Sequence, residues 1–143
     1  MKTKIIPVLT LIILLIIYSC EKIEFRRDIS GTWNTFFAGG GLSLSEIKTN
    51  YTSLRLTSHN RYSIFNYDTL KASGKYTLFE SGYKNNKYYE PFYIKFEKGS
   101  PYDAKLVFPI EGNLDISIFN SDTIAFSPRD ISDGLQFFFT KSK

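Results

Sequence analysis

The sequence predicts an all-β protein, an antiparallel up-and-down meander of eight or nine short strands that closes into a barrel. Two observations predict this class. Apolar and polar residues alternate in short runs, and turn residues separate most of the runs. The composition includes 13 Phe, 10 Tyr and one Trp, residues that favour pleated, half-buried surfaces. Because no long helical pattern follows the N-terminal segment, we do not expect a parallel sheet with crossover helices.

The alternation locates each strand in turn. Short links between the runs force neighbours in sequence to pair antiparallel. His59-Asn60 is one such link, since Asn tolerates a positive φ. The spacing of Ser43 and Glu46 matches a capping box, so residues 44–49 form either a short helix or a loop. The expected strands are residues 29–37, 51–58, 61–68, 74–80, 88–98, 104–110, 114–120, 123–127 and 135–141.

The N-terminal segment has the pattern of a secretion signal. Two lysines lie within Met1–Lys4, and the run Ile5–Tyr18 is almost entirely aliphatic. Ser19 and Cys20 follow, and this small-residue–Cys junction resembles the lipobox of bacterial lipoproteins. We therefore expect a signal-peptide helix over residues 1–19, a charged tether over 20–28 and a barrel domain over 29–143. The alternative for the first segment is an uncleaved signal anchor.

The lipobox resemblance assigns Cys20, the single cysteine, as the site of lipid attachment. Palmitate and related acyl chains would hold the protein on the membrane, because each buried methylene contributes about 0.8 kcal/mol. No aspartate follows Cys20, so the retention signal that keeps enteric lipoproteins at the inner membrane is missing. We expect an outer-membrane lipoprotein of the bacterial envelope, and the sequence leaves the leaflet open.

The charge excludes a polyanion-binding function. The chain has 18 basic and 14 acidic residues; without Lys2 and Lys4 of the signal segment the excess falls from +4 to +2. No stretch gathers Lys and Arg into a patch, so we expect no nucleic-acid partner. The single cysteine also excludes an internal disulfide framework and a thiolate zinc cluster.

The order of several weak motifs resembles one family. The motif "GTW" at Gly31–Trp33 opens the first barrel strand, a hairpin over 54–64 and the strand 74–78 follow, and an aromatic strand ends the chain. Together these motifs resemble the lipocalin-like lipoproteins of Bacteroidota over residues 29–141. The resemblance implies that Gly31 and Trp33 plug one end of the barrel. It also implies that a late basic residue, Lys141 or alternatively Arg129, packs over the Trp33 ring by a cation–π contact.

Catalytic chemistry has little support in the sequence. His59, the single histidine, lies in an expected turn without a second metal-ligating neighbour. Strand carboxylates are better explained by solubility than by acid–base catalysis. We therefore expect no enzyme, no catalytic residues, no metal and no cofactor. The carboxylates considered are those of Glu90, Glu97, Asp103 and Asp115.

Two functions remain. The first is a membrane-anchored binding lipoprotein that holds a small apolar or amphipathic ligand, or docks an envelope protein, at the open end of the barrel. The loop over 39–50 would be its lid, and the ligand-binding residues are unknown. The alternative is a structural or accessory lipoprotein whose barrel is filled by its own side chains and which docks through outward aromatic residues. The outward aromatics are Phe65, Tyr67, Phe79, Tyr93, Phe119 and Phe138.

Overall fold

The computed structural model describes residues 28–40, 45–81, 92–129 and 135–143. Within these residues the structure is all-β, which confirms the predicted class. The strands are β1 Gly31–Gly40, β2 Ser45–Glu46, β3 Ser53–Leu56, β4 Arg61–Asn66, β5 Thr69–Glu80, β6 Phe92–Phe96, β7 Asn113–Asn120, β8 Thr123–Pro128 and β9 Leu135–Lys141.

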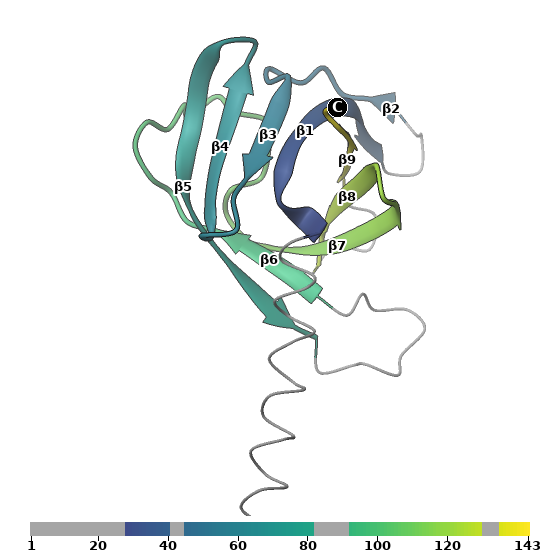
Figure 1. The fold of residues 1–143 in the computed structure, drawn as a ribbon. Coiled ribbons are helices and arrows are strands. Elements are labelled where there is room, and N and C mark those ends of the chain that lie inside the picture. The colour runs from purple at the N-terminus through teal and green to yellow at the C-terminus, as the bar shows by residue number, and fades with distance from the viewer. Residues whose placement is uncertain (1–27, 41–44, 82–91, 130–134) are drawn as a thin grey trace, which may run out of the picture.

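The strands form one closed antiparallel meander (Figure 1). Apart from the two-residue β2, each strand pairs with its neighbours in sequence, and β9 returns to pair with β1. Trp33 shows the closure, since its register partners are Leu54 on β3 and Lys141 on β9. The predicted barrel is therefore confirmed, with eight strands in its wall.

Period-two alternation builds the core. On β4, Tyr62 and Ile64 are buried, whereas Arg61, the first residue of the strand, is exposed. On β6, Phe92, Ile94 and Phe96 are all buried. Burying one such side chain contributes about 1.5–3 kcal/mol, so the lumen supplies most of the apolar stabilisation. The largest fully buried side chains are those of Trp33, Tyr62, Tyr76, Phe126, Phe137 and Phe139.

One predicted strand is wrong. Residues 104–110 do not pair with any strand and instead lie in the irregular connection from Glu97 to Gly112. Phe108 and Ile110 are nevertheless buried, so the alternation in sequence marks side chains that turn into the barrel rather than a ladder. Pro101 and Pro109 lack the backbone N–H that a ladder needs. We call residues 97–112 the plug segment.

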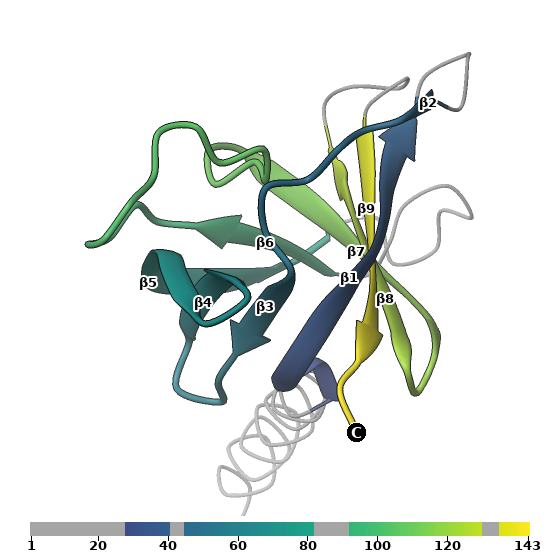
Figure 2. The same cartoon turned by 90° about the horizontal axis from the view of Figure 1, so that it is seen from above.

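The start of β1 and the C-terminus lie close together at one end of the barrel (Figure 2). The plug segment begins beside Lys75 at that same end, runs along β5 and reaches Asn50 at the other end. Side chains and backbone groups next to the barrel wall hold the plug segment in this position. The Asn50 amide donates to the carbonyl of Lys105 at 2.7 Å and accepts from the N–H of Val107 at 3.1 Å. Lys71 forms an ion pair with Asp103 at 3.4 Å.

The helix considered for residues 44–49 is not formed within the described part of that range. Ser45 and Glu46 pair with the last residues of β1 as β2, and the N–H of Ile47 donates to the carbonyl of Ala38 at 2.7 Å. Gly39 and Gly40 are the β1 residues that pair with β2, so extended pairing takes the place of the helix at Ser45 and Glu46. The predicted turn at His59-Asn60 is confirmed, with Asn60 at a φ of 60°.

Candidate functional site

The end of the barrel at which β1 starts is closed by Trp33. Its ring is 1% exposed, and its Nε1 donates a hydrogen bond of 2.8 Å to the carbonyl of Ile29, two residues before β1. Ile29 itself is fully buried. Ile29 therefore packs against the Trp33 ring, and the indole N–H provides the hydrogen bond that the buried carbonyl of Ile29 needs.

Lys141, rather than Arg129, lies over the Trp33 ring. Its Nζ is 5.1 Å from the ring centroid and 3.3 Å from the carbonyl of Asp28, to which it donates. Gly31 belongs to the same closure, because a Cβ at that position would lie 3.2 Å from Cε of Lys141 and its φ is 142°. The structure thus brings Gly31, Trp33 and Lys141 together, as the family resemblance implied.

Arg129 contributes to a different cluster on the outside of the wall. Its guanidinium lies 4.2 Å from the centroid of the Tyr93 ring, 3.5 Å from a carboxylate oxygen of Asp115 and 2.9 Å from the Ser81 hydroxyl oxygen. The Tyr93 ring stacks on Phe79 at 5.0 Å. The cation is thereby shared between a ring and a carboxylate, which ties together the outer faces of β5, β6, β7 and β8.

The lumen is filled by side chains, and Phe108 of the plug segment is at the centre of them. It is 3% exposed, and its neighbours meet its ring mostly edge to face, the favoured geometry for aromatic pairs. The ring centroids that surround it, at 5.4–6.0 Å, belong to Tyr51, Phe96, Phe126, Phe137 and Phe139. The plug segment therefore occupies the space in which an open barrel would hold a ligand.

The three lumen tyrosines differ in how their hydroxyls are bonded. Tyr62 donates to the carbonyl of Glu97 at 3.0 Å, and Tyr76 donates to the carbonyl of Thr57 at 2.7 Å. The Tyr51 hydroxyl is buried and has no hydrogen-bond partner among the described residues. Burial raises the pKa of Tyr51, and burial followed by the charge of nearby Tyr102 raises the pKa of Tyr62 to about 12.

An aromatic strip crosses the outside of β1 and β9, formed by Phe36, Phe37 and Phe138. Phe36 is 73% exposed, and the Phe37 and Phe138 rings meet at 5.9 Å. The ladder between β1 and β9 has a bulge between Thr35 and Phe37. Because a bulge adds a residue to one strand, it gives two successive phenylalanines to this outer region. We call these three residues the β1 aromatic strip.

Two hollows border the β1 aromatic strip. A cleft of about 280 Å³ lies between it and the segment over 47–52, where the β1–β3 ladder has stopped. Thr35 and Tyr51, whose hydroxyls are buried without a described partner, belong to its wall. An apolar groove of about 240 Å³ on the other side is lined by the strip itself with Gly39, Gly40 and Gln136.

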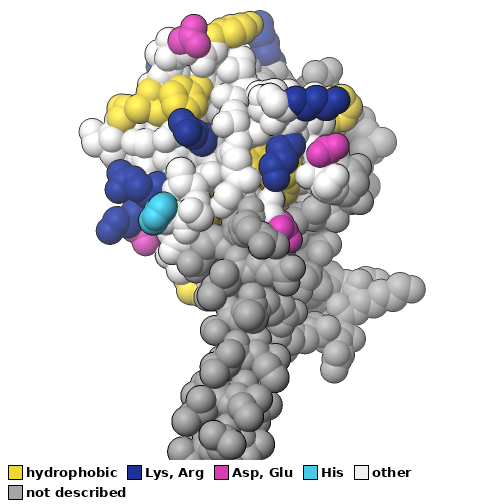
Figure 3. Space-filling model, in the orientation of Figure 1, with side chains coloured by type: hydrophobic (Ala, Val, Ile, Leu, Met, Phe, Trp, Pro, Cys, Tyr) yellow, Lys and Arg dark blue, Asp and Glu magenta, His cyan; other side chains and the backbone are white. Residues whose placement is uncertain are grey.

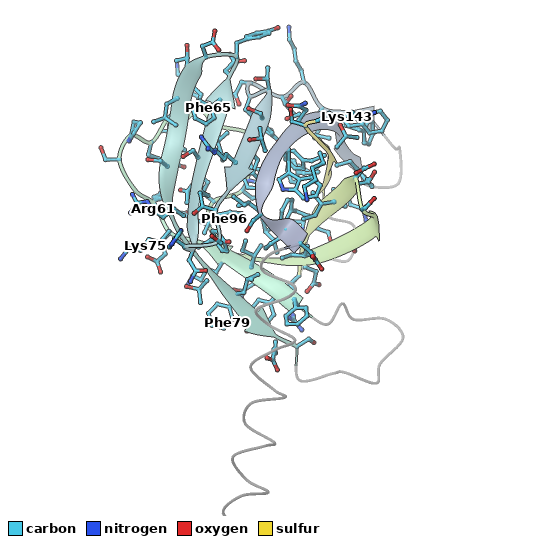
Figure 4. All side chains as sticks on the ribbon, viewed as in Figure 1. Arg61, Phe65, Lys75, Phe79, Phe96 and Lys143 are labelled. Carbon is cyan, nitrogen blue, oxygen red and sulfur yellow. The ribbon has the colours of Figure 1, made fainter. Side chains whose placement is uncertain are left out.

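The outward aromatics predicted from strand parity are placed as follows. Tyr67 is 80% exposed in the β4–β5 turn, Phe79 is 36% exposed, and Phe65, Tyr93 and Phe138 are half-buried on the outside of the wall. Phe65 and Phe79 lie at opposite ends of this wall in Figure 4. The Phe119 side chain lies outside the described residues. Parity missed Phe36 because no alternation in sequence reveals a bulge, although the adjacent Phe36-Phe37 pair before two glycines was a usable signal.

The carboxylates considered from the sequence are dispersed or paired. Asp103 binds Lys71, and this ion pair together with the N–H of Lys105 holds the pKa of Asp103 below its usual range; the N–H is the larger cause. Asp115 is paired with Arg129, and Glu90 lies outside the described residues. Across the described ranges no three His, Cys, Asp or Glu side chains gather as metal ligands.

His59 lies in the exposed β3–β4 turn, where its Nδ1 is 3.5 Å from the Ser58 hydroxyl oxygen. Cys20, the signal segment and most of the tether lie outside the described residues. Among the residues that are described, no helix is long and apolar enough to cross a bilayer. No protein-family model, curated protein or solved structure matches this chain.

Proposed function

We propose that this protein is an outer-membrane lipoprotein, anchored through lipid on Cys20, that docks an envelope protein through the β1 aromatic strip. On this proposal the chain belongs with the lipocalin-like lipoproteins of Bacteroidota, and it performs no catalysis. The barrel acts as a rigid scaffold that holds the strip at a fixed place relative to the membrane. Of the two functions expected from the sequence, this is the accessory one.

The occupied lumen is the observation that carries the proposal. Phe108 fills the centre of the barrel, and Trp33 closes its far end. A ligand-carrying barrel normally offers a concave pocket of several hundred Å³ in the lumen. Among the described residues, two hollows lie on the outer wall instead, on both sides of the exposed Phe36. Aromatic side chains of this kind are enriched at the centre of protein interfaces.

Site-specific photo-crosslinking in the native host tests the docking function. A photoreactive phenylalanine analogue at position 36 should link the protein to one discrete envelope protein. The same analogue at Lys95 is the control, because Lys95 is exposed on β6, which lies across the barrel from β1 in the strand order. The Phe138→Ser variant should remove the adduct from position 36 without changing the amount of folded protein. Equal adducts from both positions, or none from position 36, contradict docking through the strip.

A second candidate function is supported by the cleft beside the strip. Its wall includes Thr35 and Tyr51, whose buried hydroxyls have no described hydrogen-bond partner. A small amphipathic ligand in this cleft would place its apolar part on Phe36 and Phe37. Native mass spectrometry of the protein purified from its own host decides the question. A co-purifying molecule that is lost in a Phe36→Ser, Phe37→Ser variant supports the ligand function, whereas the bare protein mass supports docking alone.

A further inference from the structure

A polar groove of about 280 Å³ lies on the outer wall where β4, β5 and the start of the plug segment run side by side. Gly74 and Gly99 form its floor. A Cβ on Gly74 would collide with the carbonyl of Glu97, and one on Gly99 would collide with the carbonyl of Ser73. The two backbones therefore touch at these glycines, and the Tyr62 ring also packs against Gly74. The side chains around it are those of Arg61, Lys75, Glu97, Lys98, Ser73 and Ser100.

Two cations in this groove have no ion-pair partner among the described residues. Arg61 and Lys75 are directly opposite in the β4–β5 register and both are exposed. Like charges at such positions destabilise a sheet. Lys98 is paired with Glu111, but neither Arg61 nor Lys75 forms an ion pair within the described parts of the chain. An anion held between them would relieve the repulsion, with Glu97 opposing it as the one acidic residue that lines the groove.

The strand register places the groove near the start of the barrel domain. Gly31, the first residue of β1, pairs with Leu56 at the end of β3, and Arg61 begins β4 after the following turn. Since neighbouring strands lie about 4.8 Å apart, Arg61 is roughly 10 Å from β1 along the sheet. In Figure 3, Lys and Arg side chains gather beside the single histidine. Figure 4, in the same orientation, labels Arg61 and Lys75 in that region.

This end of the barrel is held close to the membrane if Cys20 carries lipid. An extended chain rises at most about 3.6 Å per residue, so the tether from Cys20 to Asp28 spans no more than about 29 Å. The start of the barrel domain would therefore stay within about 29 Å of the anchor, a distance from which the groove can reach bilayer phosphates. A basic side chain near an anionic surface strengthens binding by about five-fold.

We propose that the Arg61–Lys75 groove binds the phosphate of an anionic lipid headgroup in the membrane that anchors the chain. The inference rests on the proposed lipid anchor but not on the β1 aromatic strip. It gives the tethered barrel a second contact with the bilayer and thereby one orientation, in which the strip is presented to its partner. The contact is electrostatic, so salt weakens it.

Lysine acetylation of the full-length protein in nanodiscs tests this site. The nanodiscs contain either phosphatidylcholine alone or phosphatidylcholine with phosphatidylglycerol, and mass spectrometry follows the rate at Lys75 relative to Lys95. Lys95 is an exposed residue on the outside of β6 and serves as the internal reference. Phosphatidylglycerol should slow Lys75 acetylation about five-fold relative to Lys95, and phosphatidylcholine alone should not.

Three substitutions distinguish binding at this groove from nonspecific electrostatic attraction of the protein to the membrane. Arg61→Gln should reduce the protection of Lys75 by about five-fold, and Glu97→Gln should increase it. Arg55→Gln removes the same charge from an exposed position on β3 outside the groove, and should leave the protection unchanged. Equal effects of Arg55→Gln and Arg61→Gln would overturn the site, because they would indicate only net charge.

Two further outcomes would overturn the proposal. Equal Lys75 rates in the two lipids would exclude a headgroup site. Protection by inorganic phosphate in phosphatidylcholine nanodiscs, matching that by phosphatidylglycerol, would assign the groove to a free anion. Palmitate labelling of the same protein reports the anchor separately, so failure of the groove and failure of the proposed anchor can be told apart.

Discussion

At the scale of single residues, the lumen tyrosines provide a matched comparison. The Tyr76 hydroxyl donates to a backbone carbonyl, whereas the equally buried Tyr51 hydroxyl has no described partner. An unpartnered buried hydroxyl costs about 1–3 kcal/mol, and a formed hydrogen bond contributes about 1 kcal/mol. Tyr51→Phe should therefore be neutral or raise the free energy of unfolding by about 1 kcal/mol, and Tyr76→Phe should lower it by a similar amount. Urea unfolding followed by Trp33 fluorescence measures both, and a loss at Tyr51 as large as that at Tyr76 would indicate an unseen partner.

Tyr62 makes stability depend on alkaline pH. Its pKa in the folded protein is raised to about 12, chiefly by burial. Tyrosine in an unfolded chain has a pKa near 10, so on raising the pH the unfolded state loses this proton first. The contribution of Tyr62 is therefore complete below pH 10 and is lost between about pH 10 and 12. Tyr62→Phe should flatten the fall in unfolding free energy over that range. Tyr67→Phe, at an 80% exposed position, is the control and should leave the slope as it is.

The closure at Trp33 depends more on burial than on charge. Trp33→Phe removes the donor to the buried Ile29 carbonyl and part of a large apolar surface, so it should lower the free energy of unfolding by about 2–4 kcal/mol. Lys141→Met keeps the apolar stem but removes the cation over the ring, which is worth about 0.5–1 kcal/mol at an exposed site. Urea unfolding followed by circular dichroism compares both without relying on tryptophan. A larger loss for Lys141→Met than for Trp33→Phe would reverse this ranking.

At the scale of elements, alternation predicts the eight wall strands because each of them has one face in the lumen and one outside. The same signal fails at residues 104–110, where Phe108 and Ile110 are buried by an irregular segment. Alternation reports burial on one side and cannot report whether the backbone groups have a ladder partner. Alternation also missed β2, because a strand of two residues, Ser45 and Glu46, is too short to show a period.

The candidate site was only partly predictable. Strand parity correctly placed Phe138 on the outside of β9, and the family resemblance led to Lys141 at Trp33. The β1 aromatic strip depends on a bulge after Thr35, which follows from the register with β9 and not from β1 alone. The Arg61–Lys75 groove likewise requires the register of two strands and the contact at Gly74. Strand parity alone reveals neither of them.

The plug segment can be tested as an element through Phe108. Phe108→Ala removes a ring that contacts five others, and a large-to-small change of this kind costs about 3–5 kcal/mol of unfolding free energy. It should also open an apolar cavity, so that benzene raises the melting temperature of the variant but not of the wild type. Phe36→Ala is the matched control and should change stability by less than about 0.5 kcal/mol. A small loss at Phe108, or no response to benzene, would mean that the wall collapses around a weakly packed plug.

At the scale of the whole molecule, described residues close both ends of the barrel, and the two sites proposed for binding lie on its outer wall. Trp33 and Ile29 close one end, and the plug segment closes the other. The β1 aromatic strip and the Arg61–Lys75 groove lie on different parts of this wall. Anchoring at Cys20 would hold the groove towards the membrane, and the rigid wall would then fix where the strip is displayed.

The anchor is the premise on which this arrangement depends, and Cys20 tests it. In the native host the wild-type protein should incorporate labelled palmitate and fractionate with the outer membrane. Cys20→Ala should abolish the label, because no second thiol is present in the chain to accept an acyl group. Since several acyl chains each contribute many methylenes at about 0.8 kcal/mol apiece, their loss should release the cleaved barrel from the membrane or leave an uncleaved precursor. Cys20→Ser keeps the size of the side chain and should behave like Cys20→Ala. Equal labelling of wild type and variant, or an intact mass that still begins at Met1 in the wild type, would contradict a lipid-anchored protein and with it the orientation inferred for the barrel.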